Sequence, residues 1–170
     1  IAIAGDRIVA VGAPDDVIAA APAAVPVVDY GEQFICPGFH DAHLHFFHTS
    51  VASSPYMLMD MGTSEAALVQ HAREFSQGLP DDAWIVTQGW RDYRWDPPEH
   101  PTKASVDAAF PDRPCVMYSG NGHTLWLNSR ALDALGVTRD SEPPAGGSYD
   151  KDANGELTGI AHETAAMQLL

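Results

Sequence analysis

Two histidines separated by a single residue, His43 and His45, lie in the segment that most constrains this chain. Residues 39–46 follow a Pro-Gly pair and a run of apolar and β-branched residues, a pattern that predicts a strand. Because side chains alternate across a strand, His43 and His45 would share one face with Asp41. Neutral imidazole is the commonest protein ligand for zinc and similar ions. The spacing therefore predicts a metal site, with Asp41 as a supporting acid.

An alternative has to be weighed against the metal site. A chain with eight histidines produces some His-x-His pairs by chance, and two histidines on one strand face can simply be surface residues. The opposite face would carry Ala42, Leu44 and Phe46 together with His40, so the strand is expected to be at least half buried. A buried pair of imidazoles beside an acid needs a partner or an ion. This context favours metal ligation.

The charge and hydropathy of the chain exclude several classes of function. The net charge is −14 and the isoelectric point is near 4.6, which argues against nucleic acid and anionic membrane surfaces as partners. No apolar run approaches the length of a membrane span, and no basic segment followed by an apolar core opens the chain. Two cysteines, Cys36 and Cys115, do not make a disulfide framework and are predicted to be buried thiols. We expect a cytoplasmic location.

Both ends of the chain are predicted to be cut. It starts at Ile1, without Met, inside an expected strand, and it stops at Leu170 inside an expected helix.

The pattern of apolar residues and turn signals predicts a chain of mixed α and β elements. Residues 1–12 are predicted to form a hairpin, residues 15–21 a short helix, and residues 25–30 and 34–36 two more strands, with no catalytic role for any of them. The elements expected further along are helices at 64–75, 102–110 and 124–135, strands at 83–90 and 114–119, a hairpin at 149–158 continuing through Glu163, and a helix from Thr164.

Several further residues are candidates for a site. Trp90 and Trp95 lie around the end of an expected strand, where they could line a substrate pocket or form a satellite core; the sequence favours neither. His123 follows a glycine-rich turn, where it could contact a ligand or act as a capping residue. For His48 the preferred interpretation is an exposed loop residue, and for His71 a helix-packing residue.

Residues 150–155 match the first half of a calcium-binding EF-hand loop. The position of the bidentate Glu is occupied by Ala161, and residues 143–148 are rich in Pro and Gly where the incoming helix should be. A hairpin turn at Asn154-Gly155 explains the same residues without an ion.

Residues 33–46 resemble the first barrel strand of the metal-dependent amidohydrolase superfamily, with Asp-x-His-x-His at its end. His40 departs from that pattern, which usually has an aliphatic residue there. Later segments resemble one branch, the amidohydrolase-3 group of YtcJ-like hydrolases and N-substituted formamide deformylases. These segments are Gln88-Gly-Trp90 with Trp95, residues 111–114, residues 122–132, Gly146-Gly147, residues 152–159 and Glu163-x-Ala165.

The resemblance implies an α/β fold, the N-terminal part of a metal-dependent (β/α)8 TIM-barrel hydrolase with a small flanking β-sandwich. Residues 1–35 would belong to the sandwich and 36–54 to the first barrel strand and its loop. Residues 55–155 would form an α+β insertion, and 156–170 would return to the barrel.

The resemblance also implies a mechanism. A divalent metal, expected to be one or two zinc ions, would be held by His43, His45 and Glu163, and would activate water to cleave a non-peptide carbon–nitrogen bond of a small amide-type substrate. His123, Trp90 and Trp95 would contact substrate, and the catalytic acid would lie beyond Leu170, so this fragment alone is expected to be inactive. We allow for a homo-oligomer. The alternatives are a deaminase or cyclic-amide hydrolase of the same superfamily, or an inactive metal- or ligand-binding homologue.

Overall fold

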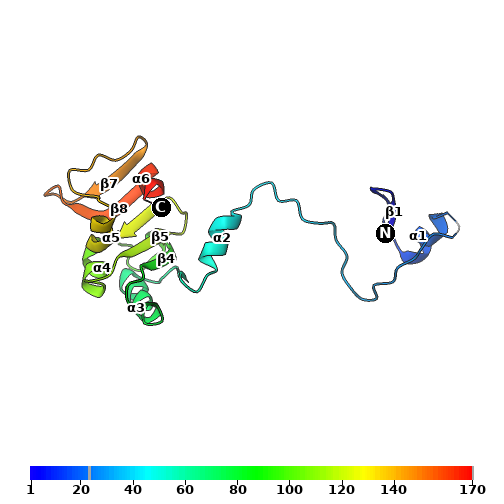
Figure 1. Cartoon of the computed structure of the whole chain (residues 1–170), viewed down its shortest axis with the longest axis horizontal. Coiled ribbons are helices and arrows are strands. Elements are labelled where there is room, and N and C mark those ends of the chain that lie inside the picture. Colours follow the sequence, from blue (N-terminus) through cyan, green and yellow to red (C-terminus); the bar gives the residue numbers. More distant parts are fainter. Residues whose placement is uncertain (23, 170) are drawn as a thin grey trace. The chain divides into compact units, whose positions relative to one another are not determined.

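The computed structural model describes residues 1–22 and 24–169, except for the side chain of His48. The chain divides into two compact units, Ile1–Ala42 and His43–Leu170, which we call the N-terminal and C-terminal units (Figure 1). Each is described by itself.

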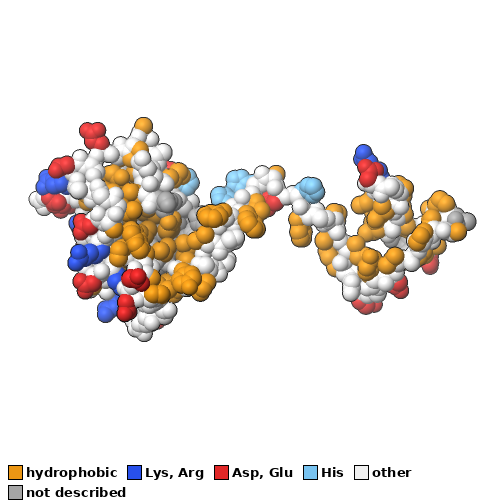
Figure 2. All heavy atoms as spheres, viewed as in Figure 1, with side chains coloured by type: hydrophobic (Ala, Val, Ile, Leu, Met, Phe, Trp, Pro, Cys, Tyr) orange, Lys and Arg blue, Asp and Glu red, His pale blue; other side chains and the backbone are white. Residues whose placement is uncertain are grey.

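The N-terminal unit contains little regular structure. Strands β1 (Ala2–Ala4) and β2 (Arg7–Ala10) form the expected antiparallel hairpin, and helix α1 (Pro14–Ala20) follows. Val17 on α1 is the buried residue of the unit among those the structure describes. Apolar side chains elsewhere in the unit are exposed to solvent (Figure 2).

The strands predicted for residues 25–30 and 34–36 are absent, as is the strand predicted for residues 39–46. The backbone is irregular there, and helix α2 (Phe46–Ala52) begins where the third of these strands should end. Leu44 and Phe46 are 61% and 71% exposed, so the expected half-buried strand is wrong for this structure. Strand conformation is stabilised by cross-strand pairs and by burial, and the described part of this segment has neither.

The C-terminal unit is built on a six-stranded mixed sheet with helices on both faces (Figure 1). The first three strands in the spatial order are parallel and the remaining pairs are antiparallel. In spatial order the strands are β3 (Leu58–Met59), β4 (Ile85–Trp90), β5 (Cys115–Ser119), β6 (Thr124–Leu127), β8 (Leu157–Glu163) and β7 (Gly147–Lys151).

Alternate side chains of the central strands enter two separate hydrophobic cores. Trp126 packs in the core that includes α3 (Glu65–Ser76) and α4 (Lys103–Ala109), while Leu125 and Leu127 pack in the other. The second core includes residues of α5 (Ser129–Ala134) and α6 (Thr164–Gln168). A short 3-10 helix, η1 (Asp92–Arg94), follows β4. Because the central strands of the sheet are buried on both faces, their sequences are nearly continuous apolar runs.

Most local expectations for this unit are confirmed. Helix α3 begins after Ser64, whose hydroxyl accepts a hydrogen bond from the backbone N–H of Ala67 at 3.1 Å. The helix predicted at 124–135 is wrong in its first half, because β6 occupies Thr124–Leu127 and α5 starts only at Ser129. Pairing with β5 and β8 outweighed the helical pattern.

Asn128 separates β6 from α5 and fixes that boundary. It is fully buried, and its side-chain oxygen accepts hydrogen bonds from the backbone N–H groups of Cys115 and Ala131, each at 2.9 Å. Its amide nitrogen donates to the carbonyls of Phe110 at 2.9 Å and Arg113 at 2.8 Å. One side chain therefore caps a helix and joins three segments of the unit.

The two cysteines differ from each other. Cys115 is buried, as predicted, and burial raises the pKa of its thiol. Cys36 is exposed, so its predicted burial is wrong. It lies in the irregular segment where the predicted strand did not form.

Candidate metal-binding and substrate residues

The imidazole rings of His43 and His45 lie side by side just before helix α2. Their Nε2 atoms are 2.9 Å apart, the ring centroids are 4.9 Å apart, and both side chains are exposed. The pairing predicted from the spacing is therefore present, although the backbone that presents it is not a strand. His45 is the N-cap residue of α2, so the pair lies where the chain turns into this helix.

This geometry fits two ligands of one ion. Zinc–nitrogen bonds of about 2.0–2.1 Å at a tetrahedral angle separate two ligand nitrogens by roughly 3.3 Å, which a small ring rotation would give here. A third protein ligand is still needed for a tight site. Among the residues that the structure describes, no group of three or more His, Cys, Asp or Glu side chains is arranged to hold a metal. Glu163 is thus not gathered with the two histidines.

Glu163 instead pairs with His123. The Nδ1 atom of His123 lies 2.8 Å from Oε2 of Glu163, and both side chains are about half exposed. Glu163 is the last residue of β8 and precedes α6, with a positive φ of 52° that ends the strand sharply. Its backbone N–H donates to the carbonyl of His123 at 2.7 Å. The pair is therefore held by main-chain contacts and is open to a ligand.

The backbone of the turn before His123 is held in a defined conformation. Gly122 has a φ of 75°, and the side-chain oxygen of Asn121 accepts hydrogen bonds from the hydroxyl of Ser119 and the backbone N–H of His123. A residue with a side chain would be strained at Gly122, so this turn requires glycine. The loop therefore fixes the backbone at His123, directly before β6 begins at Thr124.

Trp90 and Trp95 belong to a buried cluster with Trp126. The three ring centroids are 6.2–6.4 Å apart, and the rings are 0–5% exposed. Each indole N–H donates to a backbone carbonyl, of Met117, Met61 and Thr102 respectively. This is core packing of aromatic rings with satisfied polar ends. A role for Trp90 and Trp95 in substrate binding stays a prediction.

The remaining candidates are placed as follows. Asp41 is exposed and belongs to the N-terminal unit, so its support of the histidines stays a prediction. The side chain of His48 lies outside the described residues. His71 on α3 is exposed and pairs with Asp60 rather than packing in a core, so its predicted role is wrong.

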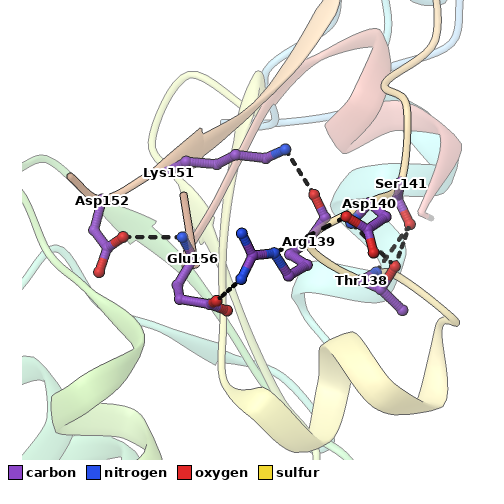
Figure 3. Close-up of polar contacts among 7 residues, drawn as sticks. All are labelled: Thr138, Arg139, Asp140, Ser141, Lys151, Asp152 and Glu156. Carbon is purple, nitrogen blue, oxygen red and sulfur yellow. Dashed lines mark hydrogen bonds and ion pairs between the residues drawn. The ribbon is translucent and has the colours of Figure 1, made fainter. Parts of the chain in front are cut away.

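The segment that resembles a calcium loop is the turn of the β7–β8 hairpin. Asp152 Oδ1 accepts a hydrogen bond from the backbone N–H of Asn154 at 2.8 Å. It also accepts one from the backbone N–H of Glu156 at 2.9 Å (Figure 3). These hydrogen bonds lower the pKa of Asp152, because they stabilise its charged form. Arg139 pairs with Glu156 across the same hairpin. The turn interpretation is confirmed.

The sequence analysis missed a cavity of about 420 Å³ in the C-terminal unit, lined by both polar and apolar side chains. It lies beside the ends of β4 and β5 and the paired strands β6, β7 and β8. The polar residues of its lining come from five separate segments of the chain, so no single sequence motif could have predicted the cavity. The residues that contribute charge or imidazole to the lining are Arg91, Asp92, His100, Asp150, Lys151 and His162.

Comparison with known proteins identifies the class. The model of the amidohydrolase family known as Amidohydro_3 matches residues 27–170. The chain belongs to this family, and the resemblance seen in the sequence is confirmed.

The protein YtcJ of Bacillus subtilis (strain 168) is 36% identical over 76% of this chain and 24% of its own length. An N-substituted formamide deformylase of Arthrobacter pascens is 29% identical over 96% of this chain and 30% of its own length. The chain thus spans less than a third of the length of either relative.

A solved metal-dependent hydrolase of Pyrococcus furiosus is 27% identical, with a TM-score of 0.51 over 78% of this chain and 24% of that chain. No helix among the described residues has the length and apolar character that a membrane span requires.

Proposed function

We propose that this chain is the N-terminal part of a metal-dependent hydrolase that cleaves a non-peptide carbon–nitrogen bond in a small amide-type substrate. The observation that carries the proposal is the convergence of Nε2 of His43 and Nε2 of His45 at 2.9 Å, in a chain of the amidohydrolase family. The names of the formamide deformylase and of the Pyrococcus hydrolase support the bond type and the use of a metal.

His43 and His45 would hold the metal, which we propose to be zinc, through neutral Nε2 atoms. A bound zinc ion lowers the pKa of its water and polarises a carbonyl. Asp41 would support this pair without binding the metal, by accepting a hydrogen bond from a ring N–H. We propose a (β/α)8 barrel with a flanking sandwich as the fold of the whole enzyme, with residues 55–155 as an insertion.

Glu163 and His123 would act on the substrate side. With the proton on Nδ1, His123 would donate a hydrogen bond to Glu163, and Nε2 of the neutral ring would be a hydrogen-bond acceptor. Such a nitrogen can accept the proton of a substrate N–H or of a water. Alternatively, Glu163 could turn to the metal as a third ligand. The buried cluster of Trp90 and Trp95 would keep the backbone around Gly89 in place and supply the apolar side of the substrate site.

The test is metal content by mass spectrometry of the full-length parent. We expect one or two equivalents of a transition metal, lost in His43→Ala/His45→Ala. His71→Ala/His100→Ala removes two imidazoles elsewhere and is expected to keep the metal. A protein that takes up no metal, even after supplementation, would contradict the proposal and favour an inactive binding homologue.

Substrate class is tested separately with N-substituted formamides, cyclic amides and amino-substituted heterocycles. Release of formate with retention of the amine on the other product supports the amide hydrolase. Release of ammonia from the heterocycles would indicate the deaminase instead.

A further inference from the structure

The cavity of the C-terminal unit has features of a small-molecule site. Its volume of about 420 Å³ falls in the range of ligand pockets, roughly 300–1,000 Å³. Among the described residues, its lining includes Thr124 and His162 but neither of their chain neighbours His123 and Glu163. His162 and Glu163 are consecutive residues of β8 and point to opposite faces, so the cavity faces away from the His123–Glu163 pair, although Trp90 contributes to its lining.

The two acids of the cavity already have partners. Asp92 Oδ2 lies 2.7 Å from Nδ1 of His100, and Asp150 Oδ2 lies 3.1 Å from Nε2 of His162. Asp92 also accepts a hydrogen bond from the backbone N–H of Tyr93 at 2.9 Å. These contacts direct both carboxylates toward imidazoles.

Arg91 is the cation of the cavity without such a partner. In the described part of the chain, its guanidinium forms no ion pair, whereas Arg7, Arg130 and Arg139 each pair with an acid. Among the described residues, Arg73, Arg94 and Arg113 also form no ion pair with an acid. Arg91 differs from them because it lines the cavity. Lys151, the other cation of the lining, donates to the carbonyl of Arg139 at 2.7 Å (Figure 3).

The position of Arg91 depends on a glycine. A Cβ atom at Gly120 would lie 2.5 Å from Nε and 3.0 Å from Cγ of Arg91. Gly120 is itself fixed, because its N–H donates to the carbonyl of Trp90 at 2.8 Å. The side chain of Arg91 therefore lies directly against the loop after β5, half buried at the cavity wall.

A second donor lies in the same loop. The side-chain oxygen of Asn121 already accepts two hydrogen bonds, from Ser119 and His123. That assignment leaves its Nδ2 group as a donor, and no hydrogen bond from it is found among the described residues. Arg91 and Asn121 thus present unused N–H groups, while Tyr93 on the rim offers an aromatic face that is largely exposed.

We propose that this cavity binds the carboxylate of a small aromatic acid, with the Arg91 fork as its anchor, Asn121 as a second donor and Tyr93 beside the ring. A planar guanidinium matches a carboxylate with two parallel hydrogen bonds. The nearby Asp92 and Asp150 disfavour a doubly charged anion such as phosphate, because like charges repel at short range. A singly charged carboxylate can pair with Arg91 and is repelled less by the two acids than phosphate is.

The test is calorimetric titration of the full chain with sodium benzoate at low ionic strength, with benzamide as the uncharged analogue and inorganic phosphate as the competing anion. We expect benzoate to bind at least tenfold more tightly than either. Arg91→Gln should weaken benzoate roughly tenfold or more, since it removes a charge-assisted pair. Arg94→Gln makes the same change three residues away, outside the lining, and should leave benzoate affinity unchanged.

Several results would overturn the proposal: no binding of benzoate, equal binding of benzamide, tighter binding of phosphate, or equal losses in the two variants. Circular dichroism checks that Arg91→Gln still folds. If it does not fold, the benzoate affinity of Arg91→Lys is measured instead, because Lys keeps the positive charge but cannot form the two parallel hydrogen bonds of a guanidinium. A loss of threefold or more then supports the proposal, and unchanged affinity contradicts it.

Discussion

The two units of this chain contain similar runs of apolar residues, but these runs form buried strands only in the C-terminal unit. In the C-terminal unit, apolar runs such as Cys115–Ser119 became central strands with side chains buried on both faces. In the N-terminal unit, residues 25–36 have a comparable pattern, yet Val27, Val28 and Phe34 are 67%, 67% and 89% exposed. The difference shows that a strand pattern needs neighbouring strands before it becomes a strand. The four predictions that follow test this contrast, from the largest expected effect to the smallest.

Replacing Asn128 with Ala should destabilise the C-terminal unit by roughly 3–5 kcal/mol, because it leaves several buried backbone groups without hydrogen bonds. Urea unfolding followed by tryptophan fluorescence measures it, since the tryptophan cluster lies in this unit. Gln77→Ala, at an exposed position of the same unit, and Gln33→Ala in the N-terminal unit should each change the transition by less than about 0.5 kcal/mol. Equal effects of all three would remove the contrast between the units.

Cys36 should react with a thiol reagent at least about 100-fold faster than Cys115 at neutral pH. Cys36 is exposed, whereas burial both shields Cys115 and raises its pKa, so that little thiolate forms. Time-resolved labelling should show one fast and one slow thiol, and Cys36→Ser should abolish the fast phase alone. Two fast phases in the native chain would mean that the sheet opens readily around β5.

Thr87→Val should stabilise the C-terminal unit by up to about 1 kcal/mol. Thr87 is fully buried on β4, and its hydroxyl finds no hydrogen-bond partner among the described residues. Removing a buried polar atom that makes no hydrogen bond recovers part of its desolvation cost, and valine has nearly the same shape. The urea midpoint measures it, and a clear loss of stability would indicate a partner for this hydroxyl, such as a buried water.

Asp152→Ala should cause a small loss of stability at pH 7 that disappears in acid. The folded-state pKa of Asp152 is lowered, so its carboxylate stabilises the folded state above its ordinary pKa and loses this effect as the pH falls through the lowered value. Thermal unfolding of the variant and the native chain from pH 7 to pH 2 measures the change. Asp133→Ala, an exposed acid on α5, removes the same charge as a control. A difference that persists at the lowest pH would show that the turn hydrogen bonds do not depend on charge.

The sequence predicted local structure well wherever the signal was local. The helix expected at 64–75 formed, with Ser64 as its cap, and Asn154-Gly155 formed its hairpin turn. It failed at Thr124–Leu127, where a helical pattern became β6. It also failed to reveal the cavity around Arg91, whose lining residues are far apart in the chain. Of the candidate site, it predicted that His43 and His45 would meet, and missed that Glu163 would pair with His123.

By itself, the sequence determined the family, the pairing of two imidazoles separated by one residue, and the caps and turns, because these depend on residue type and short spacing. The tertiary structure decided which apolar runs became strands, which tryptophans were buried, and which acids met which histidines. These outcomes depend on contacts between segments far apart in the chain, where pairing and burial outweigh local preference.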